Sequence, residues 1–449
     1  MRLTWVQPED LLPHELVQSE VEGKPVSSAR ERWIEAGGDP TPAVGGASAN
    51  PADGGLRKLA SRLLDELDNE AAASHPDEPE MWDDIADVIE PIGACCPGTD
   101  YPARVVGAWT GRAAGCLLGK PVEKIPRQGI EEILRCTGQW PLAGYFTAVG
   151  LSQEVAARWP WNKRSAPTSL AENIVGMPED DDLNYTMLAL ELLEHHGFNF
   201  TADDVAQLWL DDLPAGRVFT AERAVYRNLL EGISPDKCAV IRNPFREWIG
   251  AVIRADMFGW TQPGNPALAA QLAWSDARLS HIRNGVYGAM WAASLASWAM
   301  VAEDVHEVLD VAARCVPPRS RLAEAIAFGR SAAQFGLVEG IDRLHDRYGS
   351  LHWVHVLNNA ATIAFAIELG DGDFGASVCA AVTAGWDTDS AGATVGAVVG
   401  ALAGIHGIGA AWTEPLDGRI ATSLPGGAQL IEDLAARTVA VALRDGARL

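Results

Sequence analysis

Residues 385–404 form the stretch GWDTDSAGATVGAVVGALAG, in which two aspartates precede a run of small residues. Glycine recurs there every four residues, at Gly392, Gly396, Gly400 and Gly404. In a helix these positions share one face, and a face without side chains lets another backbone approach closely. The stretch therefore predicts a helix at the centre of a helical bundle. Its apolar part, residues 391–411, is about long enough to span a bilayer, but it consists of Gly, Ala and Val and begins at acidic residues, so we predict a buried helix and no membrane span.

A second glycine-spaced segment, GAWTGRAAGCLLGKPVE, occupies residues 107–123. Its spacing predicts another tightly packed helix, and Lys120-Pro121 should end it. Glu123 then falls in the following loop, a usual place for catalytic groups. An ordinary surface acid is the alternative interpretation of Glu123.

Helical periodicity dominates from about Pro102 onward, and alternating β-branched residues are scarce, which predicts an all-α body over residues 100–449. Residues 1–99 are expected to form a partly helical N-terminal arm, with a flexible Gly/Pro/Ala-rich linker at 37–55. Helices are predicted over 56–69, over 183–196 before Gly197, and from Asn243-Pro244 to Gly259.

The composition limits the classes of partner. The chain has 449 residues, 48% of them hydrophobic, which suits a protein with a large core. Its formal net charge of -25 argues against nucleic-acid binding, because phosphates would be repelled. Seven cysteines without a CxxC pair and an N-terminus without a signal peptide predict a cytoplasmic protein. The sequence leaves the oligomeric state open.

Three adjacent acids, Asp180, Asp181 and Asp182, lie in PEDDDLNYT at residues 178–186, just before a predicted helix. The dipole of a helix N-terminus offsets the repulsion among these carboxylates only partly, since it contributes up to about 1 kcal/mol at an exposed site. A cation would neutralise them, whereas a solvated capping cluster is the simpler alternative.

Asp387, Asp389 and Ser390 precede the glycine-faced helix, where a buried charge needs a partner. Arginine partners at two helix caps would satisfy that need. A hard divalent cation would do so as well, because carboxylate and hydroxyl oxygens favour magnesium, calcium or manganese over zinc. We therefore predict a magnesium site, with manganese as the alternative ion.

The order GRAAGCLLGKPVE, PEDDDLNYTMLALELLE and GWDTDSAGATVGAVVGALAG resembles the ADP-ribosylglycohydrolase family over about residues 105–404. Each motif is weak alone, but the three in this order are specific. The resemblance implies a single large all-α orthogonal bundle that binds two magnesium ions at its centre, with the arm as an extension. It also implies hydrolysis of the N-glycosidic bond of an ADP-ribosyl or related ribosyl substrate.

The resemblance further assigns roles to individual residues. It places the metal ligands at Asp180, Asp181, Asp182, Asp387, Asp389 and Ser390. Glu123 and Asp181 take the catalytic positions, with Glu123 acting on the substrate or the attacking water. Gly250, Arg254, His281 and Trp386 are candidates for substrate binding, although a hydrogen-bonded core histidine is the simpler interpretation of His281.

Three departures from the family pattern affect these expectations. Asp180 replaces the usual threonine and adds a negative charge to the metal site. Cys116 replaces an aspartate and Ile249 an asparagine, both expected on the substrate side. An N-ribosidase acting on a free nucleoside, nucleotide or NAD-derived metabolite is thus an alternative to an enzyme for protein-linked ADP-ribose. A binding protein without catalysis ranks third, because all five aspartates are present.

Overall fold

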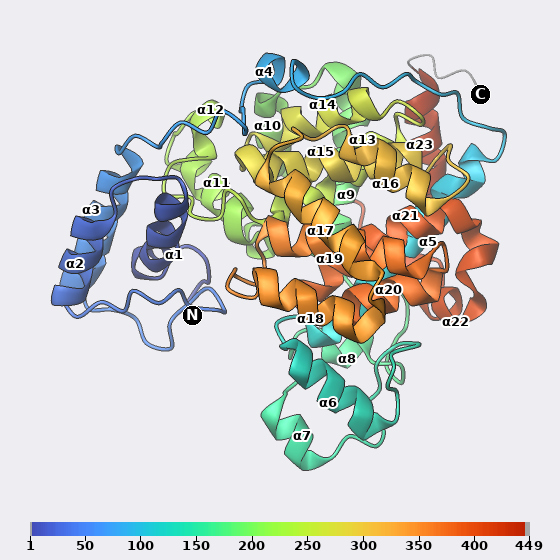
Figure 1. Ribbon diagram of the computed structural model, residues 1–449, viewed down its shortest axis with the longest axis horizontal. Helices are drawn as coiled ribbons and strands as arrows, with labels where there is room; N and C mark the ends of the chain where they lie inside the picture. Colours follow the sequence, from blue (N-terminus) through green and yellow to red (C-terminus); the bar gives the residue numbers. More distant parts are fainter. Residues whose placement is uncertain (1, 445–449) are drawn as a thin grey trace.

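The computed structural model describes residues 2–444, in which helices are almost the only regular secondary structure (Figure 1). Helices make up 62% of these described residues, which confirms the predicted all-α class. The two strands, β1 (Arg419–Ile420) and β2 (Gln429–Leu430), form a two-residue antiparallel pair.

The N-terminal arm, residues 2–99, carries the first four helices; the first three project from one side of the body, whereas the fourth lies over the body (Figure 1). They are α1 (Pro8–Val21), α2 (Ser27–Glu35), α3 (Gly54–Asp68) and α4 (Trp82–Ala86). The α3 helix confirms the prediction for residues 56–69, and its buried face carries Leu63, Leu64 and Leu67. Residues 37–53 contain no helix or strand.

The body contains the remaining helices. Its first half has α5 (Tyr101–Gly119), η1 (Lys120–Val122), α6 (Arg127–Thr137), α7 (Gln153–Arg158), α8 (Ala166–Ser169), α9 (Asp181–His196), η2 (Gly197–Asn199), α10 (Ala202–Asp212), η3 (Ala215–Arg217), α11 (Thr220–Leu230) and α12 (Pro235–Cys238). Its second half has η4 (Ile249–Arg254), α13 (Asp256–Trp260), α14 (Pro266–Ala277), α15 (Arg283–Trp298), α16 (Val305–Ala313), α17 (Arg321–Ala333), α18 (Gly336–Tyr348), α19 (Val356–Gly370), α20 (Phe374–Thr383), α21 (Thr388–Ile408), α22 (Ala410–Thr413), η5 (Glu414–Leu416) and α23 (Ile431–Arg444).

The antiparallel pair α5 and α21 lies at the centre of the body, as the glycine spacing predicted. A Cβ atom on Gly115 would lie 2.0 Å from the carbonyl oxygen of Gly392, and one on Gly111 would lie 2.1 Å from that of Gly396. The two backbones therefore touch, and larger residues at these positions would separate them. The glycine face ends at Gly404, where a φ of 61° kinks the helix.

The α21 helix is the one helix within residues 2–444 whose length and apolarity would suit a membrane span. Its apolar window is 67% buried inside the protein, against α5 and α20. The burial agrees with the predicted core helix.

The predicted helix from Pro244 to Gly259 is wrong. Residues 244–247 form a turn, Trp248 forms an isolated bridge with His355, and η4 and α13 follow as separate short helices. The backbone of this segment forms hydrogen bonds with a segment that is distant in sequence. The amide of Ile249 donates to the carbonyl of Val354, and the amide of Val356 donates to the carbonyl of Glu247. A tertiary pairing that the local pattern does not encode thus interrupts the helix.

Candidate metal and active site

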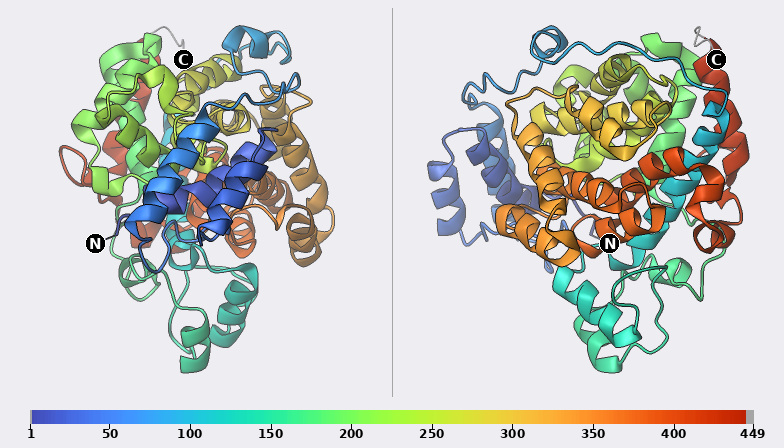
Figure 2. Two further views of the ribbon diagram at one scale, coloured as in Figure 1. Left: turned by 90° about the vertical axis from the view of Figure 1, so that its left-hand side faces the viewer. Right: turned by 45° about the vertical axis from the view of Figure 1, so that its right-hand side comes forward.

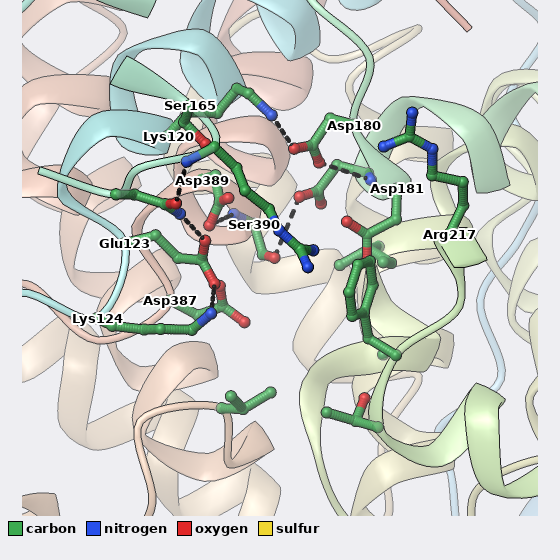
Figure 3. A pocket seen from close by; sticks show the side chains of 18 of the residues that line it. Lys120, Glu123, Lys124, Ser165, Asp180, Asp181, Arg217, Asp387, Asp389 and Ser390 are labelled. Atoms are coloured by element: carbon green, nitrogen blue, oxygen red, sulfur yellow. Dashed lines mark hydrogen bonds and ion pairs between the residues drawn. The ribbon is translucent and has the colours of Figure 1, made fainter. Parts of the chain in front are cut away.

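The first acidic cluster lies at the N-terminus of α9. The side chain of Asp180 caps this helix by accepting a hydrogen bond of 2.9 Å from the amide of Asp182. The ammonium of Lys120, at the end of α5, donates to the Asp180 carboxylate and to the carbonyl of Glu179. The first acid of the run is therefore paired, whereas Asp181 is directed into a cavity (Figure 3).

The second cluster lies at the N-terminus of α21, next to the C-terminus of α5. Gly385 and Trp386 both adopt positive φ values, 82° and 64°, and turn the chain into the helix. The hydroxyl of Thr388 donates to the carbonyl of Gly119 at 2.8 Å. Close contact of the two glycine faces thus fixes where Asp387 and Asp389 lie.

The two clusters meet, although about two hundred residues separate them. The hydroxyl of Ser390 donates to the Asp182 carboxylate at 3.2 Å. Both clusters line one cavity of about 540 Å³, with Asp387 and Asp389 on one side and Asp180 and Asp181 on the other (Figure 3). All six predicted ligand residues, Asp180, Asp181, Asp182, Asp387, Asp389 and Ser390, line it.

Glu123 also faces this cavity from the loop that follows η1. Its carboxylate accepts a hydrogen bond of 2.7 Å from the amide of Asn162 and forms an ion pair of 2.9 Å with Lys124. Two partners from different parts of the chain therefore hold the side chain beside Asp387 (Figure 3). A carboxylate fixed in this way can orient a water molecule or accept its proton.

Burial and like charge dominate the electrostatics of the acids. Burial, followed by the charge of Asp180, raises the pKa of both Asp181 and Asp182 well above the usual range. Burial and the charge of Asp389 do the same to the pKa of Asp387. Burial and the charge of Glu123 raise the pKa of Asp389 to about 7. Asp180 differs: burial opposes its ionisation, but Lys120 outweighs that effect and lowers its pKa.

These residues fit a hard divalent cation. One carboxylate oxygen of Asp182, Oδ1, is buried without a hydrogen bond within the described residues, and the nearest guanidinium nitrogen of Arg112 is 3.6 Å away. A buried and unpaired acceptor of this kind is costly. Apart from the Cys116 sulfur, the surrounding donors are carboxylate and hydroxyl oxygens, which magnesium and manganese prefer. A bound cation would satisfy the orphaned oxygen and offset the repulsion between the acids.

The sequence model of the ADP-ribosylglycohydrolase family matches residues 97–447, more than three quarters of the chain. The chain belongs to this family. A solved structure described as an "ADP-ribosylglycohydrolase-related protein complex" is 19% identical, with a TM-score of 0.47. That match covers 77% of this chain and 99% of the other. No curated protein matches the chain.

Two of the departures from the ADP-ribosylglycohydrolase pattern lie in different environments. The Cys116 sulfur is buried behind the acids, and it lies within 4.8 Å of carboxylate oxygens of Asp180 and Asp182. This substitution therefore changes the surroundings of the carboxylates, although the sequence suggested the substrate side. Ile249, in contrast, lines the cavity.

Of the four candidates for substrate binding, one lines the cavity and three do not. Gly250 lines the cavity, and a Cβ atom there would lie 2.5 Å from the Glu222 carboxylate, so a larger residue would displace that carboxylate. Arg254 is buried behind that wall, where it binds Glu222, Asp276 and the hydroxyl of Ser280. His281 lies there too, 1% exposed.

His281 forms a 2.7 Å hydrogen bond through Nδ1 with the hydroxyl of Ser280, as a core histidine does. Trp386 stacks on His345 with a centroid distance of 4.0 Å and supports the turn before Asp387. Neither side chain is among those that line the cavity. The structure thus places Arg254, His281 and Trp386 where they support the site from behind its wall.

Several basic and aromatic residues that line the cavity were not predicted from the sequence. The basic ones are Lys120, Lys124, Lys163, Arg164 and Arg217, and the aromatic ones are Trp5, Phe219 and Trp353. A signal existed for some of them, because WPWNKRS at residues 159–165 combines aromatic and basic residues in one loop. The others come from separate elements and share no local pattern.

Proposed function

We propose that the protein is a magnesium-dependent hydrolase that cleaves the N-glycosidic bond of an ADP-ribosyl or related ribosyl substrate. The observation that carries this proposal is the convergence of Asp181, Asp182, Asp387 and Asp389 on one cavity together with Glu123. Family membership supports a glycohydrolase. The oxygen donors favour magnesium, with manganese as the second choice.

The proposed mechanism follows from the charges that develop at the ribose. As the bond from C1′ to nitrogen breaks, the electron pair leaves with the nitrogen, and positive charge builds on the ring. A bound divalent cation would orient the ribose hydroxyls and lower the pKa of a bound water. Glu123 holds the attacking water and accepts one of its protons as the water oxygen bonds to C1′. The departing nitrogen takes up the proton that Glu123 then releases through solvent, so the carboxylate is restored at the end of the hydrolysis.

Charged residues at the cavity suit a phosphate-bearing substrate. The acids occupy the centre, whereas Lys163, Arg164 and Arg217 lie at exposed or partly exposed positions of the same cavity. Anionic groups such as a diphosphate would be repelled by Asp181 but attracted by these side chains. The ribose would thus face the carboxylates, and the phosphates would face the basic residues.

A specific observation favours a free small molecule as the second candidate substrate. Ile249 lines the cavity where the family pattern has an asparagine, and it removes a hydrogen-bonding group from that wall. An N-ribosidase acting on a nucleoside, nucleotide or NAD-derived metabolite would accommodate this change. A catalytically inactive binding protein remains the third hypothesis.

The test is product release from defined substrates with and without magnesium. Purified protein should release arginine from ADP-ribosyl-arginine, or the base from a nucleotide, in magnesium and not in EDTA. Asp387→Asn should abolish release, and Asp211→Asn, at an exposed position on α10, should not. Release in EDTA would refute metal dependence, and no release from any ribosyl compound would favour the binding protein.

We also propose a cytoplasmic location. All seven cysteines are free thiols in the structure, including the adjacent and exposed Cys95 and Cys96. Free thiols are typical of a reducing compartment. Cell fractionation that finds the protein outside the cytoplasm would contradict this proposal.

A further inference from the structure

Three residues of the N-terminal arm line the same cavity as the catalytic acids. They are Thr4, Trp5 and Gly45, whereas the match to the family begins at residue 97. The amide of Trp5 donates to the carbonyl of Gly46 at 2.8 Å, which joins the two arm segments. A part of the chain outside the family domain thus supplies one wall of the candidate site.

Buried ion pairs hold this arm against the body. The guanidinium of Arg246 binds Glu15 at 2.8 Å and Glu22 at 2.6 Å, and both acids belong to the arm. All three side chains are less than 5% exposed. Figure 2 shows α1 and α3 packed side by side at this face of the body. Paired buried charges of this kind fix an element strongly, since removal of one partner leaves the other uncompensated.

The arm also contacts the loop that carries Glu123. The indole N–H of Trp353 donates to the carbonyl of Val44 in the arm at 2.9 Å. Lys124 lies 5.0 Å from the centre of the Trp353 ring and pairs with Glu123. A continuous set of contacts therefore runs from the arm, through a cavity-lining tryptophan, to the proposed catalytic carboxylate.

We propose that the N-terminal arm forms an outer wall of the substrate cleft and restricts it to a free ribosyl phosphate of limited size. The inference rests on the proposed function. A cavity of about 540 Å³ is in the usual range for small-molecule sites. An ADP-ribosyl group attached to a folded protein would need to extend past the wall that Thr4, Trp5 and Gly45 supply.

Gly45 offers a direct test, because a Cβ atom there meets nothing within 4 Å and its φ lies outside the left-handed region. Gly45→Trp adds bulk at the cavity without forcing the backbone. Gly93→Trp is the matched control: this arm glycine is exposed, has equally open surroundings and lies outside the cavity lining. We expect Gly45→Trp to weaken ADP-ribose binding, measured by calorimetry, by about tenfold or more, and Gly93→Trp to bind as the wild type does.

Thermal stabilisation by magnesium, measured on the same samples, separates this inference from the proposed function. The rise in melting temperature that magnesium causes should be equal in the wild type and in both glycine variants. If the wild type binds ADP-ribose and Gly45→Trp binds it equally well, the arm is not a wall of the cleft. If the wild type takes magnesium but binds no ribosyl phosphate, both the proposed function and the inference fail.

A comparison of kcat/KM for a small and a protein-linked substrate tests the restriction in substrate size. The wild type should hydrolyse ADP-ribosyl-arginine with a higher kcat/KM than an ADP-ribosylated protein. Trp353→Phe, which removes the hydrogen bond to Val44 and keeps an aromatic ring, should narrow that difference. Equal kcat/KM values of the wild type on the two substrates would overturn the size restriction.

Discussion

Removal of one carboxylate from the acidic site should change stability in opposite directions with and without magnesium. Asp387 is 6% exposed and lies among Asp182, Asp389 and Glu123, so its charge is repelled in the metal-free protein. Asp387→Asn keeps the shape of the side chain and removes that repulsion. In EDTA at pH 8, the variant should therefore melt at the same temperature as the wild type or above it.

Magnesium should reverse this order. A ligand that binds only the folded state at a hundred times its Kd adds about 2.7 kcal/mol. The unfolding entropy expected for 449 residues is roughly 0.9 kcal/mol per kelvin, so the wild-type Tm should rise by about 3 °C. Asp387→Asn should lose most of this rise, because it loses a charged ligand.

Differential scanning calorimetry in EDTA and in a magnesium series measures both effects. Asp211→Asn, which removes an exposed charge outside the lining of the cavity, should show the full wild-type shift. A wild-type Tm that does not respond to magnesium would refute the metal site. An equal shift in Asp387→Asn would show that magnesium binds elsewhere.

Three further predictions concern the catalytic loop, the arm and pH. Glu123→Gln should lower kcat by about 10²- to 10⁴-fold in a steady-state assay while the magnesium-induced Tm shift stays intact; an unchanged kcat would remove Glu123 from the mechanism. Glu15→Ala leaves Arg246 with one acid fewer, so urea unfolding should show a loss of about 3–5 kcal/mol, and a loss below 1 kcal/mol would contradict a firmly held arm. Burial and Glu15 raise the pKa of Asp68 to about 7, so the folded state holds this proton more tightly than the unfolded chain, and stability should fall as pH rises from about 4 to 7. Asp68→Asn should reduce that fall between urea midpoints at pH 5 and pH 8, and an identical fall in variant and wild type would contradict the assignment.

The centre of the fold could be predicted because its physical cause is local. Glycine at every fourth position allows only a close helix pair, and the sequence shows that spacing twice, in α5 and α21. The acidic residues that precede the buried helix α21 can also be recognised in the sequence. The glycine contact fixes where α21 begins and therefore where Asp387 lies. The meeting of Asp181 and Asp387 at one cavity was implied by the family resemblance and not by the local pattern.

The segment around Ile249 could not be predicted from local pattern. Its apolar spacing suits a helix, but hydrogen bonds to Val354 and from Val356 take its backbone groups instead. The same limit applies to Arg254, which resembles a substrate ligand in sequence. Glu222 and Asp276 hold it inside the protein, and neither acid lies near it along the chain.

The walls of the cleft show why specificity is harder to predict than chemistry in this protein. The acids that we propose as metal ligands come from two short motifs, whereas the outer wall combines Thr4 and Gly45 of the arm with Trp353 and Arg217 of the body. Each of these residues is ordinary in its local context, and only tertiary packing brings them together. On our proposal the arm would limit the size of the substrate without altering the acids. It contacts the loop of Glu123 through Trp353 and Lys124 and supplies none of the acids that line the cavity.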